Sequence, residues 1–216
     1  MKVSAVCALA LALSAASSIR ADEIVFENSE VYSGHYASVL SEYGDEITLG
    51  GTARTLTEFI FEYAGDFFSQ GDEVGKVRFY ANDNGPFHLP GTLLWESPLF
   101  PVRKGPGVTE GWANINIDVP DTFTWTVQFF GLTMNTTAGQ LDVAGLRYYG
   151  LPKIGQSYND FWIRNGDSWQ LFGPPADVPK ANFAVRVKAV PEPSIVALAT
   201  LGAAAGIVHL LRKRSH

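Results

Sequence analysis

Cysteine is almost absent from this 216-residue sequence: the single Cys7 lies within the apolar stretch at the N-terminus. A lipoprotein signal would place its cysteine after such a stretch, so we expect no lipidation at Cys7. If the stretch is removed on export, the mature chain has no thiol, which excludes disulfides, cysteine-ligated metals and cysteine nucleophiles. The segment from Asp22 to Val190 must then be stabilised by its hydrophobic core, and it is long enough to build one.

Basic residues are scarce in the same segment, where 11 Lys and Arg stand against 21 Asp and Glu and give a formal charge of −10. Such a domain repels phosphate backbones, so nucleic acid is excluded as a partner. Histidine is rarer still: only His35 and His88 occur there, and no Gly-x-Ser-x-Gly elbow accompanies them. We therefore expect no histidine-rich metal site, no cofactor and no enzymatic activity.

Helical periodicity is also lacking between residues 22 and 190. Apolar and polar residues instead alternate, as they do in strands with one buried face. The alternating segments are 56–63, 77–81, 113–119, 123–129 and 183–189. The side chains expected to point into the core are Phe59, Phe61, Tyr63, Val77, Phe79, Ala81, Ala113, Ile115, Ile117, Val119, Phe123, Trp125, Val127, Phe129, Phe183, Val185, Val187 and Ala189.

Turn signals rich in Gly, Pro, Asn and Asp separate these segments. Asn165-Gly166-Asp167 joins Phe161–Arg164 to Ser168–Phe172 and predicts a β-hairpin. About nine or ten short strands without intervening helices indicate an all-β fold, namely an antiparallel two-sheet sandwich, for which a jelly roll is one fitting topology. Because no repeat or break in composition is visible, we expect one domain over residues 22–189.

The first 21 residues have the three parts of a secretory signal peptide. Lys2 gives a minimal charged start, residues 5–16 are apolar, and small Ala21 precedes the polar Asp22. An uncleaved anchor is the alternative, but the apolar stretch is shorter than the roughly 20 residues that a membrane span needs. We expect the chain to be exported and residues 1–21 to be removed.

A second apolar stretch, of 17 residues, runs from Ile195 to Leu211. As a helix it would be about 26 Å long, enough for a thin bilayer. Arg212, Lys213 and Arg214 follow as a stop-transfer cluster that would keep the C-terminus in the cytoplasm. A buried helix of a soluble domain would leave this abrupt basic end unexplained, so the pattern predicts one transmembrane helix with the domain outside.

Pro191, Glu192, Pro193 and Ser194 stand just before this predicted span. The two prolines block helix entry and keep the peptide extended. Pro-Glu-Pro alone is also typical of a rigid linker. Followed by an apolar span and a terminal basic cluster, however, residues 190–216 resemble the PEP-CTERM sorting signal of exported bacterial proteins.

That resemblance implies a processing partner and a destination for the protein. In the PEP-CTERM family the signal is recognised by an exosortase, a membrane-embedded cysteine transpeptidase, which is thought to cut near the motif and pass the protein to an envelope or matrix acceptor. The resemblance thus implies a protein first anchored in the membrane and then placed on the cell surface or in a biofilm matrix. It implies no reaction catalysed by the domain itself.

Several acidic and amide side chains are candidates for other sites. Asn82, Asp83 and Asn84 offer oxygen ligands in a tight turn of a kind that Ca²⁺ accepts, although a plain turn explains them as well. The second cation candidate comprises Asp66, Asp72 and Glu73. Glu58 and Glu62 share one strand face, where they fit either the carboxylate pair of a glycan hydrolase or solvated positions at a sheet edge.

Aromatic residues gather in the last third of the domain, with amide and acidic residues between them. Tyr149, Tyr158, Trp162 and Trp169 would suit a glycan-binding platform, because rings stack on sugars while polar neighbours bind hydroxyls. Alternatively, Trp162 and Trp169 lie in the core as a cross-strand pair of the hairpin.

Three functions of different classes follow from these observations. The first is a non-catalytic surface or matrix protein whose sandwich has a structural or adhesive role. The second is a lectin-like module that binds exopolysaccharide, which requires several of the four aromatic residues to be exposed together. The third is a glycan hydrolase, which requires two facing carboxylates about 5 to 10 Å apart in a cleft.

Overall fold

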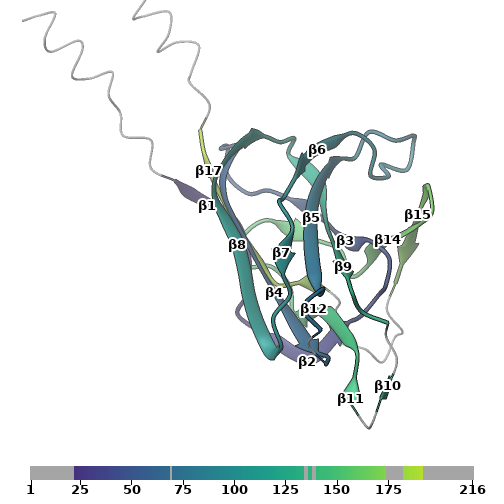
Figure 1. Ribbon diagram of the computed structural model, residues 1–216. Coiled ribbons are helices and arrows are strands. Elements are labelled where there is room, and N and C mark those ends of the chain that lie inside the picture. Colours follow the sequence, from purple (N-terminus) through teal and green to yellow (C-terminus); the bar gives the residue numbers. More distant parts are fainter. Residues whose placement is uncertain (1–21, 69, 134–135, 138–139, 174–181, 192–216) are drawn as a thin grey trace, which may run out of the picture. The chain divides into compact units, whose positions relative to one another are not determined.

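A computed structural model describes residues 22–68, 70–133, 136–137, 140–173 and 182–191 (Figure 1). Its strands are β1 (Glu23–Asn28), β2 (Tyr32–Ala37), β3 (Tyr43–Thr48), β4 (Thr55–Asp66), β5 (Val74–Ala81), β6 (Leu93–Glu96), β7 (Phe100–Pro101), β8 (Gly105–Asp118), β9 (Thr122–Phe130), β10 (Thr136–Thr137), β11 (Gln140–Leu141), β12 (Val143–Tyr149), β13 (Gln156–Ser157), β14 (Phe161–Asn165), β15 (Ser168–Phe172), β16 (Asn182–Phe183) and β17 (Val185–Val190). The described part of the chain contains no helix.

The strands form two large antiparallel sheets, in agreement with the predicted all-β fold. The first, called the β4 sheet here, has the order β1-β17-β4-β12-β16, with β8 also paired to β4 and β2 to β12. The second, the β9 sheet, has the order β15-β14-β3-β9-β5-β6, with β13 paired to β3 and β7 to β5. A short pair, β10 and β11, stands apart.

The core lies between the two sheets and is rich in aromatic rings. Phe59 of the β4 sheet packs on Phe79 and Trp125 of the β9 sheet, with ring centroids 4.8 and 5.3 Å apart. Farther along, Tyr63 and Phe129 meet at 5.4 Å. All five side chains are buried at the positions that the alternating pattern predicts, so period two identified the inner faces of β4, β5 and β9 correctly.

In β8 the pattern fails at Ala113 only, since Ile115 and Ile117 pack against the core and Val119, just after the strand, is buried. Ala113, expected in the core, is exposed, and Trp112 packs against the core in its place. The pairing of β4 with β8 shifts register between Leu56 and Glu58, and two asparagines of β8 have left-handed backbone, Asn114 with φ 59° and Asn116 with φ 55°. An irregular strand cannot keep a strict period of two.

The outer face of the β9 sheet is also less exposed than alternation suggests. The alternation in β5 places Tyr80 on the outer face, opposite to the core, yet only 6% of this residue is exposed to solvent. Thr124 and Thr126, on the outer face of β9, are buried as well. The hairpin of β14 and β15 contributes to this burial, since the Trp169 ring lies 5.5 Å from that of Tyr80. Polar side chains on this face are therefore close to one another and partly shielded from solvent.

The hairpin forms as predicted, but its tryptophans do not face each other. In the register of β14 and β15, Trp162 lies opposite Leu171 and Trp169 lies opposite Arg164. The expected cross-strand pair of Trp162 with Trp169 is therefore wrong. Register partners share a face of the sheet, and so do positions two apart on a strand, so the two rings lie on the same side of the hairpin at diagonal positions and not directly opposite each other.

The sandwich ends where the predicted sorting motif begins. β17 ends at Val190, and exposed Pro191 follows it. The remaining motif residues Glu192, Pro193 and Ser194, the expected span 195–211, the cluster of Arg212, Lys213 and Arg214, and the expected signal peptide lie outside the described residues. Within the residues that are described, no helix long and apolar enough to cross a membrane occurs.

Candidate ligand-binding cleft

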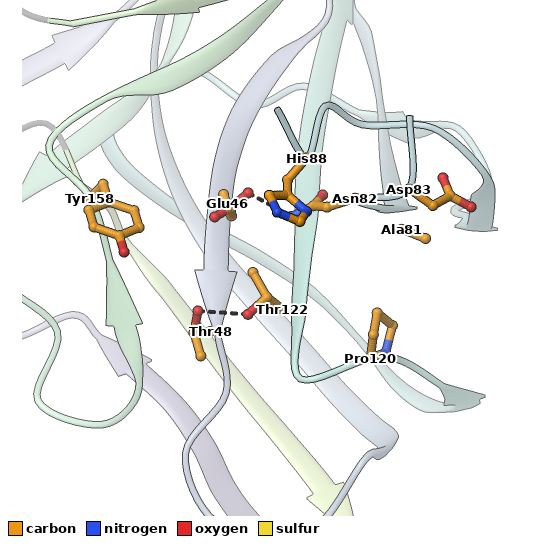
Figure 2. Close-up of a pocket in the computed structure, with 9 residues that line it drawn as sticks. All are labelled: Glu46, Thr48, Ala81, Asn82, Asp83, His88, Pro120, Thr122 and Tyr158. Atoms are coloured by element: carbon orange, nitrogen blue, oxygen red, sulfur yellow. Dashed lines mark hydrogen bonds between the residues drawn. The ribbon is translucent and has the colours of Figure 1, made fainter. Parts of the chain in front are cut away.

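Two groups of polar side chains lie on the outer face of the β9 sheet. The first is the Glu42 cluster, which consists of Glu42, Arg78, Tyr80, Thr126 and Arg164. The second lines a cavity of about 410 Å³, which we call the Glu46 cleft (Figure 2). Its lining residues are Glu46, Thr48, Ala81, Asn82, Asp83, His88, Pro120, Thr122 and Tyr158.

The Glu42 cluster is saturated by its own contacts. Only 3% of the Glu42 side chain is exposed; its Oε1 accepts hydrogen bonds from the hydroxyls of Tyr80 and Thr126, at 2.8 and 2.7 Å. Its Oε2 lies 2.9 Å from Nη1 of Arg78 and 3.2 Å from Nη1 of Arg164. A carboxylate with two hydroxyl donors and two guanidinium partners has little capacity left for a ligand, so this cluster holds the hairpin to the sheet.

The Glu46 cleft is built from segments that are distant in sequence. Glu46 and Thr48 point outward from β3, and the hydroxyl of Thr48 is 2.9 Å from that of Thr122 at the start of β9. Asn82 and His88 come from the connection between β5 and β6, and Tyr158 follows β13. Figure 2 shows Tyr158 on the opposite side of Glu46 from Asn82 and Asp83, so the acid lies between the two walls.

Asn82 is held in one orientation by two hydrogen bonds. Its amide Nδ2 donates to Oε2 of Glu46 at 2.7 Å (Figure 2), and its Oδ1 accepts from the hydroxyl of Thr124 at 2.7 Å. Because a carboxylate only accepts hydrogen bonds, the exchange of oxygen and nitrogen in this amide would lose the bond to Glu46 and place two oxygens against each other. The chain Thr124–Asn82–Glu46 therefore fixes the carboxylate of Glu46 at the floor of the cleft.

The Asn82–Asn84 turn, one of the two cation candidates, is explained by bonds within the chain. Oδ1 of Asp83 accepts from the Thr92 amide at 2.8 Å and its Oδ2 accepts from the Thr92 hydroxyl at 2.7 Å. These bonds hold the pKa of Asp83 below its ordinary value. The Asn84 amide donates to the Leu89 carbonyl and closes the turn. The Asp83 carboxylate proposed as a Ca²⁺ ligand thus stabilises the connection that carries His88, and the Asn82 oxygen is bonded to Thr124 of β9.

The other cation candidate is not brought together as one site. Asp66 lies 3.4 Å from Nζ of Lys104, whereas the Glu73 carboxylate accepts hydrogen bonds from the amides of Gln70 and Gly71. The Gln70 bond is the main cause of the lowered pKa of Glu73. Across the described ranges, no group of three or more His, Cys, Asp or Glu side chains is placed to hold a metal ion.

His88 adopts a backbone conformation that glycine would adopt more easily. Its φ is 54°, in the left-handed region, where a non-glycine residue is strained relative to glycine. Its imidazole lines the cleft, close enough to Glu46 to lower the pKa of that carboxyl. Burial, helped by the negative charge of Asp160, has the larger effect and raises the pKa of Glu46 overall. Burial also raises the pKa of Asp160.

The four aromatic residues proposed as a glycan platform do not share one exposed surface. Tyr149 is 4% exposed and Trp162 8%, whereas Tyr158 is 67% exposed. Trp169 is half-buried and lies under the guanidinium carbon of Arg164, which is 5.7 Å from its ring centroid. Only Tyr158 therefore offers an open ring face beside a cleft.

Glu58 and Glu62 belong to the other sheet and are paired with cations. Oε1 of Glu58 lies 3.0 Å from Nζ of Lys188, and Oε2 of Glu62 lies 2.7 Å from Nη1 of Arg147. The expectation of a solvated sheet edge is wrong, because β4 lies between β8 on one side and β17 and β12 on the other. Both carboxylates are therefore held in ion pairs on the outer face of the β4 sheet.

Sequence reasoning missed Glu46, Thr48 and Thr122 as site residues. The alternating pattern does place Glu46 and Thr48 on the outer face of a strand, which is the one signal the sequence offers. It does not reveal that the turn carrying His88 and the loop carrying Tyr158 close over that strand.

No family model matches this chain, and no curated protein or solved structure is significantly similar to it. The functional argument therefore rests on the chain's own residues. Chemically, the Glu46 cleft combines one exposed ring with carboxylate, amide, imidazole and hydroxyl groups. This combination suits reversible binding of a molecule that carries many hydroxyl groups.

Proposed function

We propose that this chain is an exported, exosortase-sorted protein of the cell surface or extracellular matrix, with a non-catalytic sandwich of structural or adhesive role. The observation that carries the proposal is the order Pro191-Glu192-Pro193, apolar span 195–211 and basic cluster Arg212–Arg214. The fold supports it, because the compact unit that includes the whole sandwich runs from Asp22 to Val190. These are the residues between the expected signal peptide and the sorting motif.

The distribution of charged groups supports a role that is not catalytic. Outside the Glu46 cleft, three acids each have a cationic partner. Glu58 and Glu62 point outward from β4, and Glu42 is buried. Paired acids stabilise a scaffold, whereas acid–base catalysis requires a group free to exchange its proton with substrate. The jelly-roll topology also remains part of the proposal, supported by the position of the last strand, β17, beside β1.

Processing at the C-terminus tests the sorting proposal. The full chain is expressed in a bacterium that carries an exosortase, and the mass of the envelope-associated protein is measured for wild type, Glu192→Gln and the control Glu30→Gln. We expect wild type and the control, which removes an exposed sandwich charge, to lose the span 195–211. Glu192→Gln should keep it, because a reading of the motif by charge needs the carboxylate. If all three retain the span, the chain is an ordinary single-span anchor and the sorting proposal is refuted.

A lectin-like activity is the second candidate, and the Glu46 cleft is the observation that favours it. An open cleft with an exposed Tyr158 ring and several polar groups is the arrangement that sugar recognition requires. Retardation of the whole chain, held in mild detergent, in gels that contain polysaccharide tests this candidate. Mobility unaffected by every polysaccharide would contradict it and leave the structural role.

A further inference from the structure

We propose that the Glu46 cleft binds an uncharged polysaccharide, with Tyr158 stacked on a sugar ring and Glu46 and His88 bound to its hydroxyl groups. The inference rests on the lectin-like candidate and adds the site and the class of glycan. A polyuronate or sulfated glycan is the alternative that the charges of the cleft disfavour.

Unused hydrogen-bonding capacity distinguishes this cleft from the Glu42 cluster. Oε2 of Glu46 accepts from Asn82, but its Oε1, the His88 ring and the Tyr158 hydroxyl form no hydrogen bond with any described residue. Glu46 also has no ion pair there, although burial raises its pKa and so makes an unpaired charge costly. A ligand that donates a hydroxyl hydrogen to Oε1 would relieve this cost.

The position of Tyr158 supplies the apolar part of the site. Its ring is 67% exposed and forms one wall of the cleft opposite Asn82 and Asp83 (Figure 2). An exposed ring beside polar groups matches the amphipathic surface of a sugar, whose C–H face stacks on an aromatic ring while its hydroxyls bind at the edge.

The strained backbone of His88 is a second, independent observation. Glycine would adopt the left-handed conformation of His88, at φ 54°, without the strain that a side chain causes. Backbone strain of this kind is retained where the side chain has a use. The imidazole forms no hydrogen bond with another described residue, and its one interaction in the fold is with the charge of Glu46. The side chain instead lines the cleft, where an imidazole nitrogen donates to or accepts from a hydroxyl.

The charges around the cleft select the class of glycan. Glu46 and Asp83 line it, and Asp160 lies near enough to raise the pKa of Glu46. No Lys or Arg is among the lining residues, and the segment from Asp22 to Val190 carries a formal charge of −10, with 11 basic and 21 acidic residues. Carboxylate or sulfate groups on a glycan would be repelled by these acids, whereas sugar hydroxyls would donate hydrogen bonds to them.

The volume also fits a short stretch of polysaccharide. The cleft encloses about 410 Å³, which is within the range of roughly 300–1,000 Å³ found for small-molecule sites. The site therefore recognises a segment of a chain, and affinity for a polymer would increase through rebinding along its repeats.

Affinity gel electrophoresis of the whole chain in mild detergent tests the proposal. The probes are three soluble uncharged polysaccharides, namely a β-glucan, an α-glucan and a galactomannan, and one polyuronate, alginate. We expect at least one uncharged polymer to retard the wild-type chain and alginate to leave it unaffected.

Variants of the cleft then locate the site. Tyr158→Ala and Glu46→Gln should each weaken binding by about tenfold, the effect of losing one stacking contact or one charge-assisted hydrogen bond. Phe68→Ala and Asp72→Asn, which alter an exposed ring and an exposed acid outside the cleft lining, should bind as wild type does.

A third variant separates folding from binding. His88→Gly removes the imidazole and the strain together, so it should keep or raise the melting temperature while weakening binding several-fold. A variant that binds poorly because it is unfolded would show the opposite change in melting temperature.

The outcomes separate the proposal from the function on which it rests. If an uncharged polymer binds but the three cleft variants match the controls, the site is wrong and the lectin-like activity stands. Stronger retardation by alginate than by any uncharged polymer overturns the class of glycan. If none of the four polymers binds, both the cleft proposal and the lectin-like candidate fail.

Discussion

Removal of one hydroxyl from the core, in Tyr43→Phe, should destabilise the sandwich strongly. Tyr43 belongs to β3 of the β9 sheet and is fully buried, yet its hydroxyl contacts the backbone of the other sheet. The hydroxyl donates to the Ala37 carbonyl at 2.7 Å and accepts from the Leu146 amide at 2.9 Å. Ala37 and Leu146 are register partners of β2 and β12, so the tyrosine bridges a gap in that pairing.

The magnitude follows from the two backbone groups that the variant would leave without a partner. A buried polar group deprived of its hydrogen bond costs about 1–3 kcal/mol, and the phenylalanine ring would prevent the strands from closing directly. We therefore expect the free energy of unfolding to fall by about 2–4 kcal/mol at pH 7. The matched control is Tyr158→Phe, whose hydroxyl lies on an exposed ring and should change stability by less than about 0.5 kcal/mol.

The pH dependence provides a second, independent measurement. Burial raises the pKa of Tyr43 above the ordinary value of 10.0, so the folded state holds the proton more tightly than the unfolded state does. Its contribution is complete below pH 10 and decreases as pH rises further, by about 1.4 kcal/mol per pH unit. The difference in stability between wild type and Tyr43→Phe should therefore shrink above pH 10.

Urea denaturation followed by tryptophan fluorescence at pH 7, 10 and 11 measures both effects, since Trp125 lies in the core. A loss below 0.5 kcal/mol at pH 7 would show that the backbone groups find other partners, and the reasoning about the bridge would be refuted. A difference that stays constant up to pH 11 would show that the hydroxyl is not protected from ionisation.

Two further predictions concern buried acids. Glu42→Gln should lower the free energy of unfolding, measured by urea titration, by about 3 kcal/mol, because two arginines lose a buried counter-charge. The control is Glu110→Gln, which removes an ion pair whose arginine is mostly exposed. This control should change the free energy of unfolding by less than about 0.5 kcal/mol. Burial raises the pKa of Asp45 well above the ordinary value of 3.8, so the folded state holds the proton more tightly than the unfolded state does. The contribution of Asp45 to stability is therefore complete below pH 3.8 and decreases as pH rises above this value. Asp45→Asn should therefore raise the melting temperature at pH 7 more than at pH 3, and an equal change at both would refute this assignment.

The sequence was sufficient to predict the inner faces of the sandwich, because these faces depend on a local pattern of residues. In β9, residues at every second position from Phe123 to Phe129 are buried, and the same rule holds for Phe59, Phe61 and Tyr63 in β4. Alternation follows from the geometry of a strand and does not require knowledge of its neighbours. The class of fold was predictable for this reason.

Departures from the pattern arise where neighbouring segments act on a strand. Trp112 takes the core position expected for Ala113 because the register against β4 shifts nearby. Tyr80 is buried because the hairpin that carries Trp169 covers its outward side. Neither effect is visible in the local sequence, since each depends on which strands lie next to one another.

The same limit applies to the candidate site, and it explains why Glu46 was overlooked while Glu58 and Glu62 were considered. All three are acids at outward positions of strands, but their cross-strand partners differ. Glu58 lies opposite Lys188 in the register of β4 and β17, whereas Glu46 lies opposite Thr124 in the register of β3 and β9. A lysine opposite a carboxylate forms an ion pair and uses its capacity to bind, but a threonine leaves most of that capacity available. The residues that separate a structural acid from a binding acid are therefore present in the sequence, and only the register of the sheets shows which of them meet.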